Sequence, residues 1–184
     1  MTQDTSRKRK FTRIIKAYPI ALVTIAVAIN LLVFGIEPIA IALPSREIVA
    51  ALILGALLLL ANHSWLMTST ELTRLKFEMH ATPEEWTTSG HQRSNVSDLG
   101  WQELERRKNA HTNATENTVH FVLLACLMAI VTPTAEAAVI WILGFPIGRL
   151  GHAWAYLTGN DNVRGLFMSV SLLSLYGQAS YLAV

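Results

Sequence analysis

The chain has 184 residues, of which 52% are hydrophobic and only 15% charged, with a formal net charge of +2 and a single cysteine. Soluble domains are about 25% charged, and here the apolar residues gather in long runs, so the composition excludes a disordered chain, a disulfide-stapled secreted domain and an ordinary soluble enzyme. It predicts an all-α integral membrane protein that crosses the bilayer several times.

Five apolar runs are candidates for membrane spans, because about 20 apolar residues cross a bilayer core of about 30 Å. The first, Tyr18–Ile36, has no Ala-x-Ala-like cleavage site, and we interpret it as a retained span rather than a signal peptide. The second, Ile48–Thr70, is the most apolar, since residues 48–61 contain no polar side chain. The other three runs are Val119–Val131, Ala137–Tyr156 and Gly165–Val184.

The third run continues a more polar segment that favours a helix from about Trp101 to Val131, roughly 45 Å long at 1.5 Å per residue. Such a helix projects from the bilayer. Cys126 lies within its apolar part, where we expect a small buried side chain rather than a reactive thiol. The preceding segment, His80–Gly100, is polar, and residues 82–85 (TPEE) predict a helix start with a cap, a proline and acids in the first turn. The long helix is expected to begin at Ser97 or Asp98.

The basic residues predict the orientation in the membrane. Six of the fifteen Lys and Arg precede the first span and six lie between the second and third spans, whereas the other connectors carry one or none. The positive-inside rule then places the N-terminus and the long loop in the cytoplasm and the C-terminus outside. Beside a span, a basic tail indicates topology setting or attraction to anionic lipid rather than nucleic-acid binding.

Polar side chains at membrane depth predict the functional site, because each is costly unless it is paired or hydrated. Their three- and four-residue spacing places them on one face of each helix. One alternative is structural, with Glu116 neutralising Arg149 and His63 forming an interhelical hydrogen bond. The other is an anion site, because the arginines exceed the acids on these faces and are expected to be unpaired. The residues are Arg106, Asn109, Asn113, Glu116 and His120 on the third span, Arg149, His152 and Tyr156 on the fourth, Arg164 at the start of the fifth and Arg74 at the end of the second. The histidines lack the companion ligands and spacing of a zinc site, so no metal is predicted.

Three blocks of sequence resemble the MAPEG family, the membrane-associated proteins of eicosanoid and glutathione metabolism. Residues 105–117 (ERRKNAHTNATEN) are similar to the family signature E-R-x-x-R-A-H-x-N-x-x-E-N, and residues 148–157 (GRLGHAWAYL) to G-R-x-x-H-x-x-A-Y-L. Residues 66–70, 74–75 and 81–85 resemble the end of the family's first helix and the A-N-P-E-D of its loop. Within the family the chain is most similar to the microsomal glutathione transferases and the membrane prostaglandin E synthases.

The resemblance implies the fold and its division. Residues 47–184 are expected to form a MAPEG four-helix membrane bundle with a cytoplasmic loop at about 77–100. Residues 1–46 are expected to add a basic cytoplasmic tail and one more transmembrane helix, giving five spans. The family is trimeric with sites between protomers, so a homotrimer is implied. The expected membrane is of the bacterial inner-membrane or endoplasmic-reticulum type, with the site expected to face the cytoplasm.

The resemblance also implies glutathione as co-substrate and a set of residues that contact it. Arg164 and Tyr156 take the catalytic positions at the thiol, and no metal takes part. Two departures stand out: Asn109 replaces an arginine of the signature, and Arg164 aligns only with a one-residue gap after Tyr156. The glutathione-binding positions are Arg74, Glu85, Arg106, Asn113, Glu116, Arg149, His152, Tyr156 and Arg164.

The implied function is a membrane glutathione S-transferase that conjugates the glutathione thiolate to a lipophilic electrophile arriving through membrane lipid, with peroxidase activity on lipid hydroperoxides as a second reaction. Arginines suit the two carboxylates of glutathione, an acid suits its ammonium, and a further arginine favours the thiolate, which is the nucleophile. Two alternatives remain open. One is a non-catalytic lipid-binding or scaffold subunit, which Asn109 and the extra span favour. The other is a proton or ion pathway lined by Glu116, His120 and His152.

Overall fold

The computed structural model describes residues 2–35, 40–131 and 133–183, and within these ranges every regular element is a helix. The prediction of an all-α protein is therefore confirmed. Five long helices occupy the five predicted runs and extend beyond most of their ends. They are α1 (Thr2–Ile29), α2 (Arg46–Lys76), α4 (Asp98–Ile130), α5 (Ala135–Thr158) and α6 (Asp161–Ala183).

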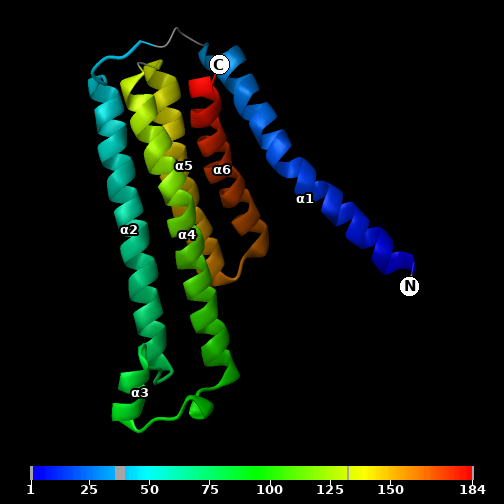
Figure 1. Cartoon of the computed structure of the whole chain (residues 1–184), viewed down its shortest axis with the longest axis vertical. Helices are drawn as coiled ribbons and strands as arrows, with labels where there is room; N and C mark the ends of the chain where they lie inside the picture. The colour runs from blue at the N-terminus through cyan, green and yellow to red at the C-terminus, as the bar shows by residue number, and fades with distance from the viewer. Residues whose placement is uncertain (1, 36–39, 132, 184) are drawn as a thin grey trace.

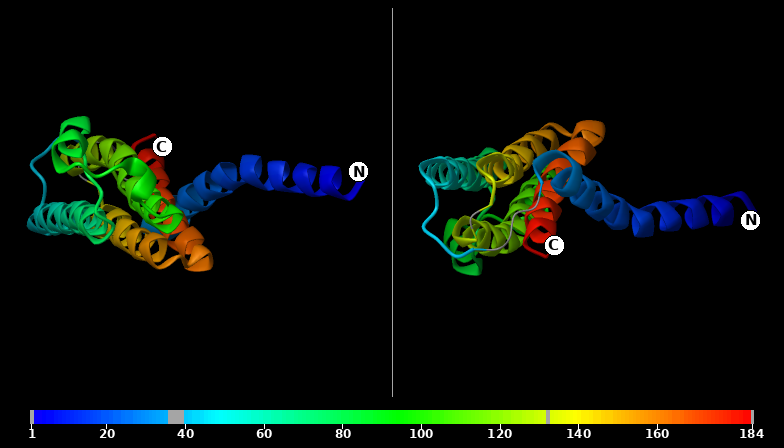
Figure 2. Two further views of the ribbon diagram at one scale, coloured as in Figure 1. Left: turned by 90° about the horizontal axis from the view of Figure 1, so that it is seen from below. Right: turned by 90° about the horizontal axis from the view of Figure 1, so that it is seen from above.

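Four of the long helices stand side by side as a bundle, and α1 leans away from it (Figure 1). Within the bundle α5 is central, since it packs against α2, α4 and, most extensively, α6. Helix α1 contacts the bundle mainly through α6. The two views along the long axis show the N-terminal end of α1 far from every other helix (Figure 2). The four-helix unit with an additional N-terminal helix thus has the architecture that the sequence predicts.

By length and composition, four helical stretches within the described residues are able to cross a membrane: Arg7–Phe34, Arg46–Lys76, Asp98–Ile130 and Asp161–Ala183. Helix α5 is the fifth predicted span. It is 24 residues long and is not among those four stretches, and it carries Glu136, Arg149 and His152. Its position among α2, α4 and α6 buries Arg149 and His152 in protein, whereas Glu136, in the first turn, is exposed.

Helix α1 starts sixteen residues before the predicted start of the first span, because the basic segment is also helical. Its C-terminal half is fastened to the bundle where the helix widens into a π-helical turn, η1 (Asn30–Phe34). There the buried Asn30 amide donates to Gly177 O and to Ser180 Oγ, both at 2.9 Å, and accepts from Trp141 Nε1 at 2.8 Å. Further along, Tyr18 Oη and Ser169 Oγ lie 2.7 Å apart. The C-terminal half of α1 is therefore part of the folded unit.

Glycines allow α5 and α6 to approach closely. A Cβ added at Gly148 would lie 2.7 Å from the backbone nitrogen of Ser171, and one at Gly151 or Gly177 would lie within 2.5 Å of a ring atom of Phe167 or Trp141. Small residues at four- and three-residue spacing are typical of close helix contacts in membranes. We call this contact the glycine seam. It fixes α5 and α6 against each other.

The segment between α2 and α4 is ordered as predicted. Helix α3 (Pro83–Ser89) begins with a capping box in which Thr82 and Glu85 each bond to the other's backbone, and Ser97 caps α4. The aromatic side chain of Trp86 packs with Met79 and Leu104 in a small core of its own. This core ties the loop to the ends of the two long helices.

The expectation that Cys126 is buried is wrong. Its side chain is exposed on the outer face of α4, because the residues of α4 that pack inward at this level are its neighbours Ala125 and Met128. The apolar run contains a lipid- or partner-facing side as well as a core-facing side.

Candidate active site

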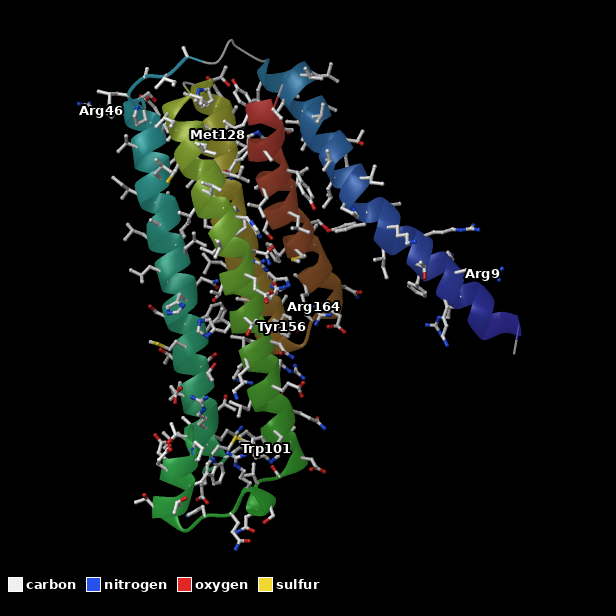
Figure 3. The ribbon with its side chains drawn as sticks, viewed as in Figure 1. Arg9, Arg46, Trp101, Met128, Tyr156 and Arg164 are labelled. Carbon is white, nitrogen blue, oxygen red and sulfur yellow. The ribbon has the colours of Figure 1, made fainter. Side chains whose placement is uncertain are left out.

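A cavity of about 400 Å³ opens where α4, α5 and α6 meet, at the end of the bundle where α5 turns into α6. This volume lies within the range of about 300–1,000 Å³ that is usual for small-molecule sites. The cavity contains four of the polar residues singled out from the sequence, Arg106, Asn109, Tyr156 and Arg164, and Figure 3 shows Tyr156 and Arg164 side by side there. Its lining is Gln102, Glu105, Arg106 and Asn109 of α4, Tyr156 and Gly159 at the end of α5, and Asp161 and Arg164 of α6.

Tyr156 and Arg164 are in direct contact. The guanidinium carbon of Arg164 lies 4.9 Å from the centroid of the Tyr156 ring, within the range of a cation–π interaction. On the inner side of the same ring lies His152, whose ring centroid is 5.5 Å away. The three side chains form a line from the buried interior of α5 to the cavity.

Gly159 makes the turn that positions this line. Its φ of +71° is the left-handed conformation that ends α5, and a Cβ there would lie only 2.8 Å from Arg106 Nη1. A side chain at this position would meet both a backbone penalty and a clash with Arg106. The glycine allows Arg106 to reach the mouth of the cavity.

The prediction of unpaired arginines is wrong for three of the four. Each has an acid three residues before it on its own helix: Glu71 for Arg74, Glu103 for Arg106 at 3.7 Å, and Asp161 for Arg164 at 3.1 Å. Residues three apart are neighbours on one helix face, so the spacing already indicates these pairs, and the sequence analysis did not count the acids Glu71, Glu103 and Asp161. Exposed pairs of this kind contribute only about 0–1 kcal/mol, so a ligand carboxylate replaces the acid at little cost.

Arg149 is the exception. It is 1% exposed, and Nη2 donates to Asn113 Oδ1 at 3.0 Å, while Nε and Nη1 have no hydrogen-bond partner among the described residues. The expected pair with Glu116 is not formed. Glu116 is exposed, one turn beyond Asn113 on α4, and Asn113 occupies the position that faces α5. A buried cation without an acid favours binding of an anionic ligand or of a partner's carboxylate.

Arg74 and Glu85 lie elsewhere. They line a second cavity, of about 500 Å³, at the loop end of α2, which shares no lining residue with the first. The Glu85 carboxylate accepts from the backbone N–H of Ala81 at 2.8 Å and of Thr82 at 3.4 Å. These hydrogen bonds lower the pKa of Glu85. Within one chain, Glu85 serves as a helix cap.

A third cavity, of about 540 Å³, lies between α2 and α4 at the level of His63. His63 Nδ1 and His111 Nε2 are 3.0 Å apart across it, so the predicted interhelical hydrogen bond of His63 is confirmed. The residues of the alternative ion pathway do not come together, since Glu116 and His120 are exposed on α4 whereas His152 is buried in α5. In the part of the chain that the structure describes, no three His, Cys, Asp or Glu side chains are grouped as metal ligands.

Comparison with known proteins identifies the family. The MAPEG family model matches residues 49–184, which include all three cavities. This chain belongs to the MAPEG family. Microsomal glutathione S-transferase 1 from Rattus norvegicus is 31% identical over 117 residues, and that from Sus scrofa is 29% identical over 117 residues. Each match covers 63% of this chain and 76% of the relative. The resemblance predicted from the sequence motifs is confirmed.

Within this MAPEG bundle, the structure brings together Arg106, Tyr156 and Arg164 at one cavity and pairs Arg149 with Asn113 behind it. It leaves Glu116 exposed and separates Arg74 and Glu85 from the rest. The sequence analysis missed Gln102, Glu105 and Asp161 as lining residues. Asp161 was detectable, because an acid three residues before Arg164 in the first turn of a helix is a usual ion-pair partner.

Proposed function

We propose that the cavity of Arg106, Tyr156 and Arg164 binds glutathione and that the protein is a membrane glutathione S-transferase acting on lipophilic electrophiles. Family membership and the two relatives support a function of the membrane glutathione-transferase type. The observation that carries the finer proposal is the contact of Arg164 with Tyr156 at 4.9 Å in a cavity that α4, α5 and α6 form together.

The chemistry assigned to this cavity is formation and attack of a thiolate. A free thiol has a pKa of about 8.5, so most of it is protonated at neutral pH. The Arg164 guanidinium, with the Tyr156 hydroxyl as hydrogen-bond donor, stabilises the sulfur anion, and the thiol proton passes to water. The thiolate then forms a carbon–sulfur bond with the electrophile while the bond to the leaving group breaks, and the leaving group departs as an anion.

Arg106 is assigned to a glutathione carboxylate, which replaces Glu103 as its partner. Arg149, held by Asn113, supplies positive charge from behind the cavity, and His152 supports the Tyr156 ring from the buried side. Asn109 lines the cavity where the family signature has arginine, so this chain holds glutathione with one positive charge fewer. The Glu105 carboxylate at the rim suits the glutathione ammonium.

Arg74, Glu85 and Glu116 join the site only if a second copy contributes. They are exposed or line another cavity in the single chain, and the implied homotrimer, with sites between protomers, accounts for that separation. In this arrangement the end of α2 of one copy covers the cavity of the next. The site then lies on the cytoplasmic side, where reduced glutathione is available, and the electrophile or lipid hydroperoxide enters sideways from membrane lipid.

The test is whether the purified full chain in detergent conjugates glutathione to an aryl halide. Arg164→Ala should lower turnover about 10²-fold, the scale for removing one preorganised electrostatic group, and change glutathione affinity much less. The near-ultraviolet absorbance of bound thiolate should shrink with it. Arg164→Lys should restore part of the rate, because a point charge lacks the planar fork of guanidinium.

The matched control is Arg46→Ala, which removes an arginine at the opposite end of the bundle (Figure 3) and should leave turnover unchanged. Wild-type turnover in Arg164→Ala would remove Arg164 from the catalytic site. If wild-type protein binds glutathione but forms no thiolate, the protein is a non-catalytic lipid-binding or scaffold member of the family, the second function that Asn109 favours.

A further inference from the structure

After Asp4, the N-terminal half of α1 carries only positive charges. Residues 5–35 include six Lys and Arg and no Asp or Glu, and every described side chain from Arg7 to Ala21 is exposed. Within this stretch the Tyr18 hydroxyl contacts Ser169 of α6. Buried packing starts at Leu22 and continues through Ala26 and Asn30. In Figure 3 the labelled Arg9 lies on the part of α1 that has left the bundle.

This exposed half has two different faces. Phe11, Ile14, Ile15 and Tyr18 follow one another at three- and four-residue steps, and all four are large exposed apolar or aromatic side chains. Arg9, Arg13 and Lys16 also repeat at four- and three-residue steps but lie on the opposite side of the helix, because each residue turns by 100°. The apolar face runs directly into Leu22, on the side that packs against α6. A basic face opposite an apolar face is typical of a helix at a membrane surface.

The length of α1 places this half at the headgroups. The stretch Arg7–Phe34 has 28 residues, about 42 Å of helix, against a hydrocarbon core of about 30 Å. The C-terminal half of this stretch is held against the bundle by the Asn30 hydrogen bonds and by the contact of Tyr18 with Ser169. Although α1 is inclined to the bundle (Figure 1), a helix of this length spans the core and brings its basic end to the headgroups.

We propose that residues 7–16 of α1 form a binding site for anionic phospholipid. Phe11, Ile14 and Ile15 lie at the acyl boundary, and Arg9, Arg13 and Lys16 contact the phosphates. The Arg7 guanidinium lies 5.7 Å from the centroid of the Phe11 ring and adds a positive charge at the end of the apolar face. Charge complementarity selects the occupant: lipid phosphates supply the anions that this stretch lacks, and acyl chains cover its apolar stripe. The site lies outside the family match and is independent of the proposed transferase activity.

The test uses the purified full chain in neutral detergent and native mass spectrometry to count bound lipid. Equal amounts of phosphatidylglycerol and phosphatidylcholine are added, with inorganic phosphate and glycerol phosphate in parallel samples. Each basic residue near a membrane surface strengthens anionic-lipid binding about fivefold. The triple variant Arg9→Gln, Arg13→Gln, Lys16→Gln should therefore lose tenfold or more of the preference for phosphatidylglycerol.

The matched control, Arg46→Gln, Arg93→Gln, Lys108→Gln, removes the same charge from exposed sites elsewhere and should keep the preference. Raising the salt concentration should weaken wild-type binding of phosphatidylglycerol and leave phosphatidylcholine unaffected. An unchanged preference in the first triple variant would overturn the proposal. Competition by inorganic phosphate as strong as that by the lipid would indicate a free-anion site and would also contradict the proposal. A variant that changes only the oligomeric mass would indicate a contact between copies, and this result would contradict it as well.

Discussion

At the scale of single residues, the buried charge of Arg149 affects both the stability of the unliganded protein and the proposed binding of glutathione. Its guanidinium is buried with one hydrogen bond to Asn113 and two nitrogens unpartnered within the described residues. Replacing a buried charged group by an apolar side chain of similar volume is often neutral or stabilising for a fold, and Arg149 has no acid to offset its burial among the described residues. The arginine is therefore retained at a cost to the unliganded protein.

This predicts an unusual result for Arg149→Met. Without ligand, the variant should unfold at a higher temperature than wild type, by about 2–4 °C for each kcal/mol gained. With saturating glutathione, it should lose most of the ligand-induced rise in Tm. Thermal unfolding in detergent with and without glutathione measures both. A lower Tm in the unliganded variant would mean that Arg149 is already compensated, as by an acid from a second copy.

At the scale of elements, the Asn30 side chain makes the buried polar contacts that attach the C-terminal end of α1 to the bundle. Asn30 uses both its donor and its acceptor groups in three hydrogen bonds to α5 and α6. Asn30→Ala would leave the Trp141 indole N–H unpartnered in the interior, and one such loss costs about 1–3 kcal/mol.

Asn30→Ala should therefore lower the thermal stability and release α1 to protease digestion near residue 20, while the core of α4–α6 stays protected. Leu31→Ala, a change at the exposed neighbour, is the control and should do neither. Equal digestion of the two variants would show that α1 is held by other contacts, such as that between Tyr18 and Ser169.

Helix α3 gives a prediction for pH. Hydrogen bonds from Ala81 and Thr82 lower the pKa of Glu85 below its usual value of 4.5. A lowered pKa in the folded state means that the carboxylate stabilises α3 fully above pH 4.5 and that this contribution is lost as the pH falls through the folded pKa. Amide exchange in residues 78–90, corrected for the intrinsic rate, should therefore increase below about pH 4.5. Glu85→Gln should show the faster exchange already at neutral pH and little dependence on pH.

The sequence predicted the elements well because their signals are local. The apolar runs, the TPEE helix start and the Ser97 cap each depend on neighbouring residues. What it could not predict are relations between helices. The choice of Asn113 over Glu116 as the partner of Arg149 depends on the rotation of α4 by less than one turn, and the separation of Arg74 from Arg164 depends on where α2 ends relative to α6. Motif spacing contains neither quantity.

At the scale of the whole molecule, the prediction concerns sidedness. Ser89 lies at the α3 end of the bundle and Thr134 at the start of α5, at the opposite end (Figure 1). In a background of Cys126→Ser, a cysteine placed at Ser89 should react with an impermeant reagent from the cytoplasm and one at Thr134 only from the other side. Labelling of both from the same side would contradict five spans and the assigned orientation.

The glycine seam has a consequence for how this protein tolerates change. Tyr156 and Arg164 sit on the two helices that the seam holds at close range, where even one added methyl group meets backbone or ring atoms. Substitutions at Gly148, Gly151 or Gly177 would push α5 and α6 apart. The distance between Tyr156 and Arg164 therefore depends on glycines that do not line the cavity. Helix α4, which carries Arg106 and Asn109, contacts the pair without such a seam. We therefore expect substitutions that change substrate preference to be tolerated at the cavity residues of α4, while the packing of α5 against α6 stays the same.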